Sequence, residues 1–354
     1  MSDPQAPQLL TDLIGQAEGV GASDIHLQTT ANGVEVALRL DGVMTPWRTL
    51  PREIAPRVFG RIKFLARLKT YQESLPQDGR IDKADTGAQH DIRVATYPTV
   101  TGEKIVLRLF NRSVVQALGE LELPPPVVDE LQRFLSGSAG LLLLTGPAGS
   151  GKTTTIYACL RFLAELGGRH IITVEDPVEQ LLPGLMQTEV NEARGLTFAV
   201  AARHLLRQDP QVLVLGEVRD DETAGLAVRA ALTGHLVIST LHAGSCQGVF
   251  ERLLVMCPDA YATVAAVELV LNQRLMRRRC SACAGGGCPA CVQTGYRGRI
   301  PVVEWLRLDD TLRAQIRGGN VGAVRPQPTL EAAARDWVRR GWSDNKEYQR
   351  LFGL

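Results

Sequence analysis

The sequence predicts an α/β fold with a parallel sheet, preceded by a small α+β domain. The later part of the chain contains short apolar runs without alternation, separated by helix-forming stretches. This pattern is typical of parallel strands that helices cover on both faces. The first part, residues 1–117, instead mixes alternating strand patterns with amphipathic helices. The apolar runs are Leu141–Leu144, Ile171–Val174, Val212–Leu215 and Leu236–Ser239.

The elements of the first domain follow from the spacing of its apolar residues. Helical spacing over residues 9–17 and 52–68 predicts two amphipathic helices. Alternation of apolar and polar residues predicts strands over residues 34–40, 90–97 and 103–110.

Three consecutive prolines mark the predicted domain boundary. The prolines at 124–126 lack the backbone N–H that a helix interior or a central strand requires. We therefore expect an extended linker and hinge over residues 118–126. Residues 127–354 then form the second domain, with a helical tail after residue 301.

Composition and charge exclude several classes of protein. With 354 residues, 45% of them hydrophobic, the chain can bury a core without disulfide staples. Its net charge of +1 does not indicate nucleic acid as the main partner. No window approaches the ~18 apolar residues of a membrane-spanning helix, and the first ten residues contain no Lys or Arg to begin a secretory signal. We therefore expect a cytoplasmic protein.

The strongest single motif is a phosphate-binding loop. Residues 146–153 match G-x-x-x-x-G-K-[ST] and lie between an apolar strand and a helix-forming stretch, as this motif requires. Its glycines let backbone N–H groups surround phosphate oxygens, and the helix N-terminus adds partial positive charge. Lys152 is expected to reach the β- and γ-phosphates, and Thr153 to bind Mg²⁺ through its hydroxyl. The expected nucleotide-binding residues are Gly146, Pro147, Ala148, Gly149, Ser150, Gly151, Lys152, Thr153 and Thr154.

Acidic residues follow the next two apolar strands. Residues 175–179 contain three carboxylates after one strand, and Glu217 follows another. Ligands of open parallel sheets lie outside the carboxyl ends of the strands, so both clusters are expected near the phosphate-binding loop. Carboxylates there would serve Mg²⁺ and an attacking water. Taken singly, each acid is equally consistent with a solvated loop.

The order and spacing of these and other stretches resemble those of the ATPases that drive type II secretion and type IV pilus assembly, the GspE/PilB-like group. The resemblance covers nearly the whole chain. It implies a RecA-like P-loop ATPase domain preceded by a small PAS-like α+β domain. Besides the phosphate-binding loop, the stretches that carry it are Ser23–Leu27, Leu75–Arg80, Asp91–Val94, Gly102–Leu109, Thr173–Glu179, Leu206–Pro210, Gly216–Asp220, Thr233–His242 and Thr294–Arg299.

The resemblance also implies roles for individual residues of the second domain. Glu179, in the segment that resembles the family's Asp box, is implied as the general base that orients water. Glu217 corresponds to the Walker B glutamate, which acts through Mg²⁺. His235 and His242 correspond to the His box near the γ-phosphate. Without the resemblance, two histidines that flank a buried strand are also consistent with satisfied core residues.

Two arginines of the first domain complete the implied site. Arg93 and Arg108 resemble the family's arginines that reach the nucleotide, where a cation stabilises charge in the transition state. The alternation of apolar and polar residues around each arginine is, by itself, also consistent with a solvated strand face. Asp24 and His26 are interpreted as capping and packing residues, outside the site.

Four cysteines form two Cys-x2-Cys pairs, the ligand set of a closed tetrahedral Zn²⁺ site. The spacer over residues 284–287 has four residues, which is shorter than usual, but glycine permits a tight reversal. A reduced, metal-free loop and an iron–sulfur site are the alternatives. The ligands would be Cys280, Cys283, Cys288 and Cys291, whereas Cys159, Cys246 and Cys257 are scattered and are interpreted as small buried side chains.

A basic run precedes the cysteine pairs. Residues 277–279 are all arginines, and beside a zinc site they suggest a nucleic-acid surface. Because the net charge is near zero and no aromatic residues are interleaved, we interpret the run as a solvated helix end or a subunit-interface element.

The sequence and the resemblance together imply a homohexameric ATPase with ATP, Mg²⁺ and Zn²⁺ as cofactors. It would act on an inner-membrane platform protein of a pilus or secretion machine, with peripheral membrane association through partners and no nucleic acid. Assembly ATPases of the family carry a tetracysteine element that retraction ATPases typically lack. The alternatives are a pilus retraction motor, a RecA-like nucleic-acid motor and a non-catalytic scaffold. Because the match begins near residue 20, recruitment is expected without the docking domain of longer relatives.

Overall fold

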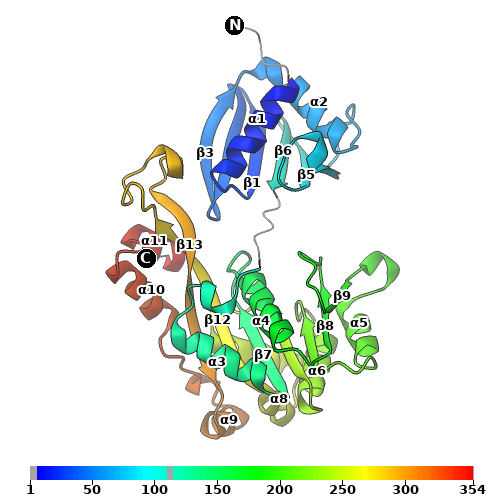
Figure 1. Cartoon of the computed structure of the whole chain (residues 1–354), viewed down its shortest axis with the longest axis vertical. Coiled ribbons are helices and arrows are strands. Elements are labelled where there is room, and N and C mark those ends of the chain that lie inside the picture. Colours follow the sequence, from blue (N-terminus) through cyan, green and yellow to red (C-terminus); the bar gives the residue numbers. More distant parts are fainter. Residues whose placement is uncertain (1–5, 110–114, 354) are drawn as a thin grey trace. The chain divides into compact units, whose positions relative to one another are not determined.

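The computed structural model describes residues 6–109 and 115–353, which divide into two compact units (Figure 1). Of the described residues, the first unit comprises 6–109 and 277–299, and the second comprises 115–276 and 300–353. The expected α+β and α/β parts correspond to the cores of these two units.

The first unit contains a six-stranded sheet within the described residues, in the order β3-β2-β1-β6-β5-β4, with every pairing antiparallel. The helices and strands predicted for this part are confirmed. Their bounds are α1 Ala6–Gly19, β1 Asp24–Thr30, β2 Gly33–Leu40, β3 Val43–Leu50, α2 Ala55–Leu65, β4 Gln77–Ile81, β5 Ile92–Thr99 and β6 Gly102–Leu109.

The two faces of this sheet differ in polarity. Helix α1 buries Leu10, Leu13, Ile14 and Ala17 in the core that the sheet shares with α2. The opposite face carries a row of charged residues, because one residue from each of five neighbouring strands stands in register there. The row consists of Arg39, Asp24, Arg108, Arg93 and Arg80.

The second unit is built on a sheet in the order β13-β12-β7-β11-β10-β8-β9. The four apolar runs are neighbouring parallel strands, β7, β8, β10 and β11, as predicted. The strands are β7 Gly140–Thr145, β8 Ile171–Glu175, β9 Met186–Glu189, β10 Val212–Leu215, β11 Leu236–Leu241, β12 Val267–Arg279 and β13 Tyr296–Arg307. The helices are α3 Pro125–Ser136, α4 Lys152–Leu166, α5 Phe198–Leu205, α6 Asp221–Leu232, α7 Cys246–Met256, α8 Ala260–Ala266, α9 Asp310–Arg317, α10 Leu330–Arg339 and α11 Asn345–Phe352.

Helices cover both faces of this sheet, which is why its strands lack alternation. In β7, Leu141 and Leu143 belong to a core shared with α5 to α9, whereas Leu142 and Leu144 belong to a core shared with α3 and α4. All six residues of the strand are buried. Because β7, β11, β10 and β8 are parallel, their carboxyl ends lie at the same edge of the sheet.

The prediction of an extended linker over residues 118–126 is wrong. Pro125 and Pro126 are the first two residues of α3, a position where a missing N–H costs no hydrogen bond. Leu118 and Leu123 are buried in the same core as α3 and α4. This segment is part of the second unit, so the division between the units precedes it.

The tetracysteine segment also differs from expectation. The sequence predicts this segment as part of the ATPase domain, but residues 277–299 group with the first unit. The backbone N–H of Gly298 donates to Asp41 Oδ2 at 2.9 Å, and Val292 packs against the core of the first unit.

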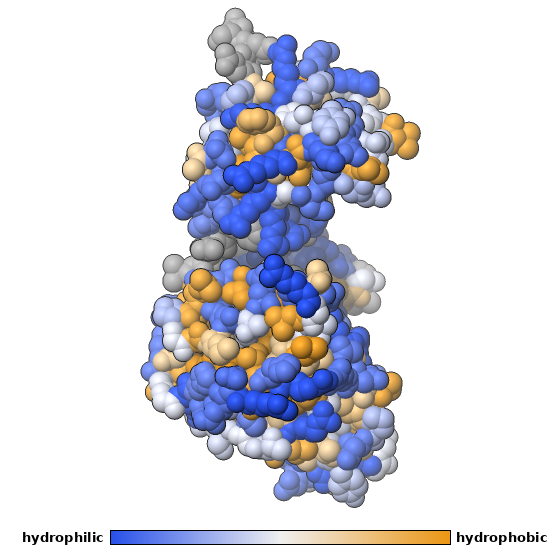
Figure 2. Space-filling view, turned by 90° about the vertical axis from the view of Figure 1, so that its right-hand side faces the viewer, coloured by the Kyte–Doolittle hydropathy of each residue, from blue (hydrophilic) through white to orange (hydrophobic). Residues whose placement is uncertain are grey.

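One face of the molecule carries apolar side chains interspersed among polar ones (Figure 2). Figure 2 shows the side of the second unit that carries β9 and α5, where apolar residues gather amid polar ones. Within the described ranges, every helix is either too short or too polar to cross a membrane.

Candidate functional site

The phosphate-binding loop connects β7 to α4, and close packing explains two of its glycines. Gly146 and Gly151 have φ angles of 133° and 89°. A Cβ atom would lie 2.3 Å from the Gln273 carbonyl oxygen at position 146 and 2.6 Å from Gln273 Nε2 at position 151. Gln273, on β12, also accepts a hydrogen bond at 2.9 Å from the buried Thr155 hydroxyl. Strand β12 therefore packs against the phosphate-binding loop.

The side chain of Lys152 folds back over the phosphate-binding loop. Its Nζ donates to the carbonyl oxygens of Gly146 and Pro147 at 2.8 and 3.0 Å. Burial lowers the pKa of Lys152, and the Glu217 carboxylate opposes that shift. Of the predicted loop residues, Ala148, Gly149, Lys152 and Thr153 line the adjoining pocket. The remaining ones build the loop around it, with Ser150 buried and Thr154 exposed.

An open pocket with a volume of about 250 Å³ lies at the carboxyl ends of the parallel strands. The structure brings the two acidic clusters together there, because Asp176 and Glu179 follow β8 and Glu217 follows β10. His242, which follows β11, lines the same pocket.

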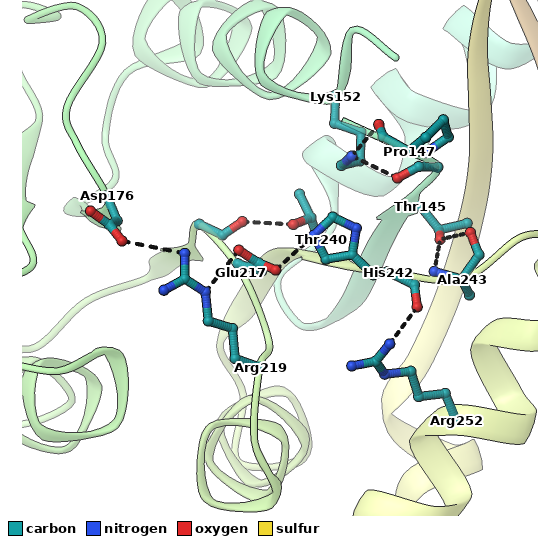
Figure 3. A network of polar contacts seen from close by, with 12 residues as sticks. Thr145, Pro147, Lys152, Asp176, Glu217, Arg219, Thr240, His242, Ala243 and Arg252 are labelled. Atoms are coloured by element: carbon teal, nitrogen blue, oxygen red, sulfur yellow. Dashed lines mark hydrogen bonds and ion pairs between the residues drawn. The ribbon is translucent and has the colours of Figure 1, made fainter. Parts of the chain in front are cut away.

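Glu217 stands between two basic side chains (Figure 3). His242 Nε2 is 2.8 Å from Glu217 Oε1, and Arg219 Nε donates to Glu217 Oε2 at 3.0 Å. Arg219 Nη2 also donates to Asp176 Oδ2 at 3.3 Å, which connects the loops after β8 and β10. The hydrogen bond to Glu217, with that carboxylate's charge and the charge of Asp176, raises the pKa of Arg219. Arg219 was missed from the sequence, although it lies two residues after Glu217.

A buried carboxylate organises the segment that contains Glu179. Glu175 is 7% exposed and accepts hydrogen bonds from Tyr157 and Thr173, both at 2.5 Å, and from Gln187 at 3.1 Å. The Tyr157 hydroxyl also accepts from the backbone N–H of Glu179 at 3.2 Å. Sequence reasoning identified the acidic segment but neither Tyr157 nor the inward position of Glu175.

The two predicted histidines lie at opposite ends of β11. His242 follows the strand and lines the pocket, whereas His235 precedes it. The backbone N–H of Gly140, at the start of β7, donates to the His235 carbonyl oxygen at 3.1 Å. His235 Nδ1 is 3.0 Å from the Ala230 carbonyl oxygen. The structure therefore brings His242, but not His235, to the pocket beside the phosphate-binding loop.

Arg93 and Arg108 belong to the first unit, whereas the pocket belongs to the second. They are paired in register on β5 and β6, and both side chains are exposed. Asp24, only 4% exposed, lies 3.2 Å from Arg108 Nε and 3.3 Å from Arg39 Nε. Asp24 was interpreted as a capping residue, but it forms ion pairs with two arginines of the row.

The four cysteines of the tetracysteine segment converge, and their Sγ atoms all lie within 4.8 Å of one another. Three Sγ pairs are 3.7 to 3.9 Å apart. Thiolates at tetrahedral corners around zinc, with Zn–S bonds of about 2.3 Å, are about 3.8 Å apart. Burial raises the pKa of the Cys291 thiol, but N–H groups of Cys288 and Gly295 donate to its Sγ and lower the pKa to about 6. The donor set and its spacing are compatible with Zn²⁺.

The short spacer does not prevent this convergence. Gly285 and Gly287 have φ angles of 88° and 93°, and Ala284 has a φ of 48°. Positive φ angles reverse the chain between the two pairs of cysteines. A Cβ atom on Gly295 would lie 2.5 Å from the Gly285 carbonyl oxygen, so a residue without a side chain is required there as well.

The fold and the site define the class of the protein, a RecA-like α/β protein with a phosphate-binding loop. The chain belongs to the family described as type II/IV secretion system protein, whose model matches residues 2–350. The fold class and the family resemblance predicted from the sequence are thereby confirmed.

Individual relatives support this membership. The chain is 41% identical to type II secretion system protein HxcR of Pseudomonas aeruginosa over 349 residues, which cover 96% of this chain and 73% of that protein. It is 38% identical to the type IV pilus assembly ATPase PilB of Thermus thermophilus over 347 residues, which cover 90% of this chain and only 39% of PilB. A crystal structure of the pilus retraction motor PilT with bound ADP superposes with a TM-score of 0.67 at 26% identity, covering 96% of each chain.

Proposed function

We propose that the chain is a Mg²⁺-dependent ATPase, and the observation that carries this proposal is the single pocket lined by Lys152, Thr153, Glu179 and Glu217. The N–H groups at the start of α4 would bind the β- and γ-phosphates of ATP. Lys152 Nζ would exchange its two loop carbonyls for phosphate oxygens. The Thr153 hydroxyl and the Glu217 carboxylate are suited to hold Mg²⁺, which when bound neutralises phosphate charge.

Glu179 acts in this scheme as the general base. It orients a water molecule and accepts its proton as the water oxygen bonds to the γ-phosphorus and the bond to the β,γ-bridging oxygen breaks. ADP and inorganic phosphate are released, and the proton returns to solvent. Arg219 and His242 hold the Glu217 carboxylate between them at 3.0 and 2.8 Å, which keeps it directed toward the pocket.

Arg93 and Arg108 would supply positive charge to the nucleotide from the first unit. Their register on neighbouring strands places two guanidinium groups side by side on an exposed face. Arginines delivered to a phosphoryl-transfer site raise the rate by about 10³–10⁵-fold. Engagement of these arginines would therefore couple the state of the nucleotide to the arrangement of the two units.

The cellular role we propose is a homohexameric motor that drives assembly of pilins or pseudopilins. It would work at the cytoplasmic side of the inner membrane, through a platform protein. Similarity to a type II secretion protein and to a type IV pilus assembly ATPase supports this role. Zn²⁺ bound by the four cysteines would stabilise the tetracysteine segment, an element that the family resemblance associates with assembly.

A retraction motor is the second candidate, favoured by the structural similarity to PilT. It uses the same chemistry with the opposite output. Deletion of the gene separates the two: cells without pili or secretion indicate assembly, and hyperpiliated cells indicate retraction.

The ATPase proposal is tested by Lys152→Ala in the full chain. Removal of the ammonium group is expected to lower ATP turnover by at least about 10²-fold, because charge stabilisation at the transferred phosphoryl group is lost. Lys346→Ala, which removes an exposed lysine of α11, is the matched control and should turn over ATP like the wild type. Unchanged ATP turnover in K152A, with both variants folded, would refute the site assignment.

A further inference from the structure

The hydroxyl of Tyr157 makes three hydrogen bonds inside the second unit. Tyr157 lies on α4 and is 6% exposed. Its hydroxyl is 2.5 Å from Glu175 Oε2 and 3.2 Å from each of the backbone nitrogens of Glu179 and Gln180. One side chain therefore contacts both ends of the acidic segment.

The direction of each hydrogen bond follows from the chemistry of the partners. A hydroxyl has one proton to donate and two lone pairs to accept with. The backbone N–H groups of Glu179 and Gln180 can only donate, so the Tyr157 proton is directed to Glu175. Burial and the adjacent Glu175 raise the pKa of Tyr157, which keeps that proton in place. The hydroxyl is thus fully satisfied in this one arrangement.

The segment held in this way needs an external anchor. Residues 176–185, between β8 and β9, form turns and bends without a helix or strand to fix them. Helix α4 begins at Lys152, so Tyr157 lies about 7.5 Å further along the same helix axis. The two backbone hydrogen bonds connect the position of Glu179 to the helix that carries the phosphate-binding loop.

We propose that Tyr157 is a positioning residue that sets the distance between Glu179 and the γ-phosphate of bound ATP. This inference rests on the proposed function, in which Glu179 is the general base. Tyr157 acts through the backbone of Glu179 and does not supply a proton to the reaction.

Tyr157→Phe removes the hydroxyl and keeps the ring in its buried site. A displacement of about 1 Å at a reacting group can cost about 10²-fold in rate, and a general base contributes about 10²–10⁴-fold. We therefore expect kcat for ATP hydrolysis to fall about 10–100-fold. The KM for ATP should change less than about 2-fold, because the phosphate-binding loop is not altered.

Tyr348→Phe is the matched control for the loss of a buried hydroxyl. Tyr348 is 8% exposed in the same unit, and its hydroxyl accepts a hydrogen bond from Arg335 Nε at 3.0 Å. Y348F should lower the melting temperature less than Y157F, because one hydrogen bond is lost instead of three, and it should leave kcat unchanged. A Y157F protein that cannot be recovered folded would overturn the positioning role in favour of a structural one.

A double-mutant cycle with Glu179→Gln separates this inference from the proposed function. If Tyr157 acts through Glu179, Y157F should lower kcat by less than about 2-fold in the E179Q background. An equal fractional loss in both backgrounds, or wild-type kcat in Y157F, would overturn the inference while the ATPase assignment stands. Full ATP turnover in E179Q would instead refute the general base itself.

Discussion

A buried carboxylate that joins four elements of the second unit offers a direct test of how that unit is held together. Glu304 on β13 is 5% exposed. Its Oε1 accepts hydrogen bonds from Cys246 N at 2.9 Å and Asn272 Nδ2 at 3.0 Å, and its Oε2 accepts from Leu330 N at 3.2 Å. Cys246 and Leu330 begin α7 and α10, so the carboxylate caps two helices at once.

Glu304→Gln keeps the shape but replaces one acceptor oxygen with a donor. The amide oxygen can stay with Cys246 N and Asn272, and the amide NH₂ then faces Leu330 N. An unsatisfied buried donor costs about 1–3 kcal/mol, and two bonds that lose charge assistance cost about 1 kcal/mol each. A neutral amide costs less free energy to bury than a carboxylate, which offsets part of this loss and leaves a net destabilisation of about 2–4 kcal/mol. For a unit of this size the melting temperature should fall by roughly 5–12 °C.

Tryptophan fluorescence is a suitable assay, because Trp305, Trp337 and Trp342 belong to the second unit and Trp47 to the first. The control is Glu331→Gln, in which an exposed carboxylate next to Leu330 is neutralised. It should shift the transition by less than about 2 °C. If E304Q melts within 2 °C of the wild type, the hydrogen bonds to Glu304 do not stabilise the second unit by the expected amount.

Two further predictions concern the first unit. Removal of metal with a strong chelator should release one Zn²⁺ per chain and destabilise the first unit, because structural zinc supplies folding free energy; purified protein that holds no metal would contradict the zinc assignment. Burial, opposed by the charge of Asp24, lowers the pKa of His26 below 6.5, and both ring nitrogens are buried without a hydrogen-bond partner among the described residues. The unfolded chain therefore binds a proton at His26 that the folded unit does not. Urea unfolding should show the free energy of unfolding falling as the pH drops below about 6.5, and His26→Gln should flatten this dependence. An unchanged pH dependence in H26Q would contradict the assignment of this effect to His26.

The features that could be predicted from the sequence are local ones. The phosphate-binding loop depends on glycine positions within eight residues, and the apolar runs specify buried parallel strands directly. The proline run was misinterpreted, because proline is excluded from a helix interior but favoured in the first turn, where Pro125 and Pro126 lie. The burial of Leu118 and Leu123 shows that the segment is part of a packed core and not an extended linker, and this burial is visible only in the structure.

The parts of the site that were missed depend on packing between distant segments. Tyr157 and Glu175 are 18 positions apart, and nothing in their spacing indicates a shared hydrogen bond. The separation of His235 from His242 could have been predicted, because the residues that flank a six-residue strand are seven steps, or about 23 Å, apart. The grouping of residues 277–299 with the first unit depends on contacts such as Gly298 with Asp41, which no local pattern indicates.

We propose that arginines of the first unit sense the nucleotide bound in the second. The most direct measurement is ATP turnover by the full chain with Arg93 and Arg108 both replaced by alanine, beside Arg52→Ala, which removes an exposed arginine of the same unit. The double variant should bind ATP normally but lose at least about 10³-fold in turnover, whereas R52A should match the wild type. Wild-type turnover in the R93A/R108A variant would contradict the account.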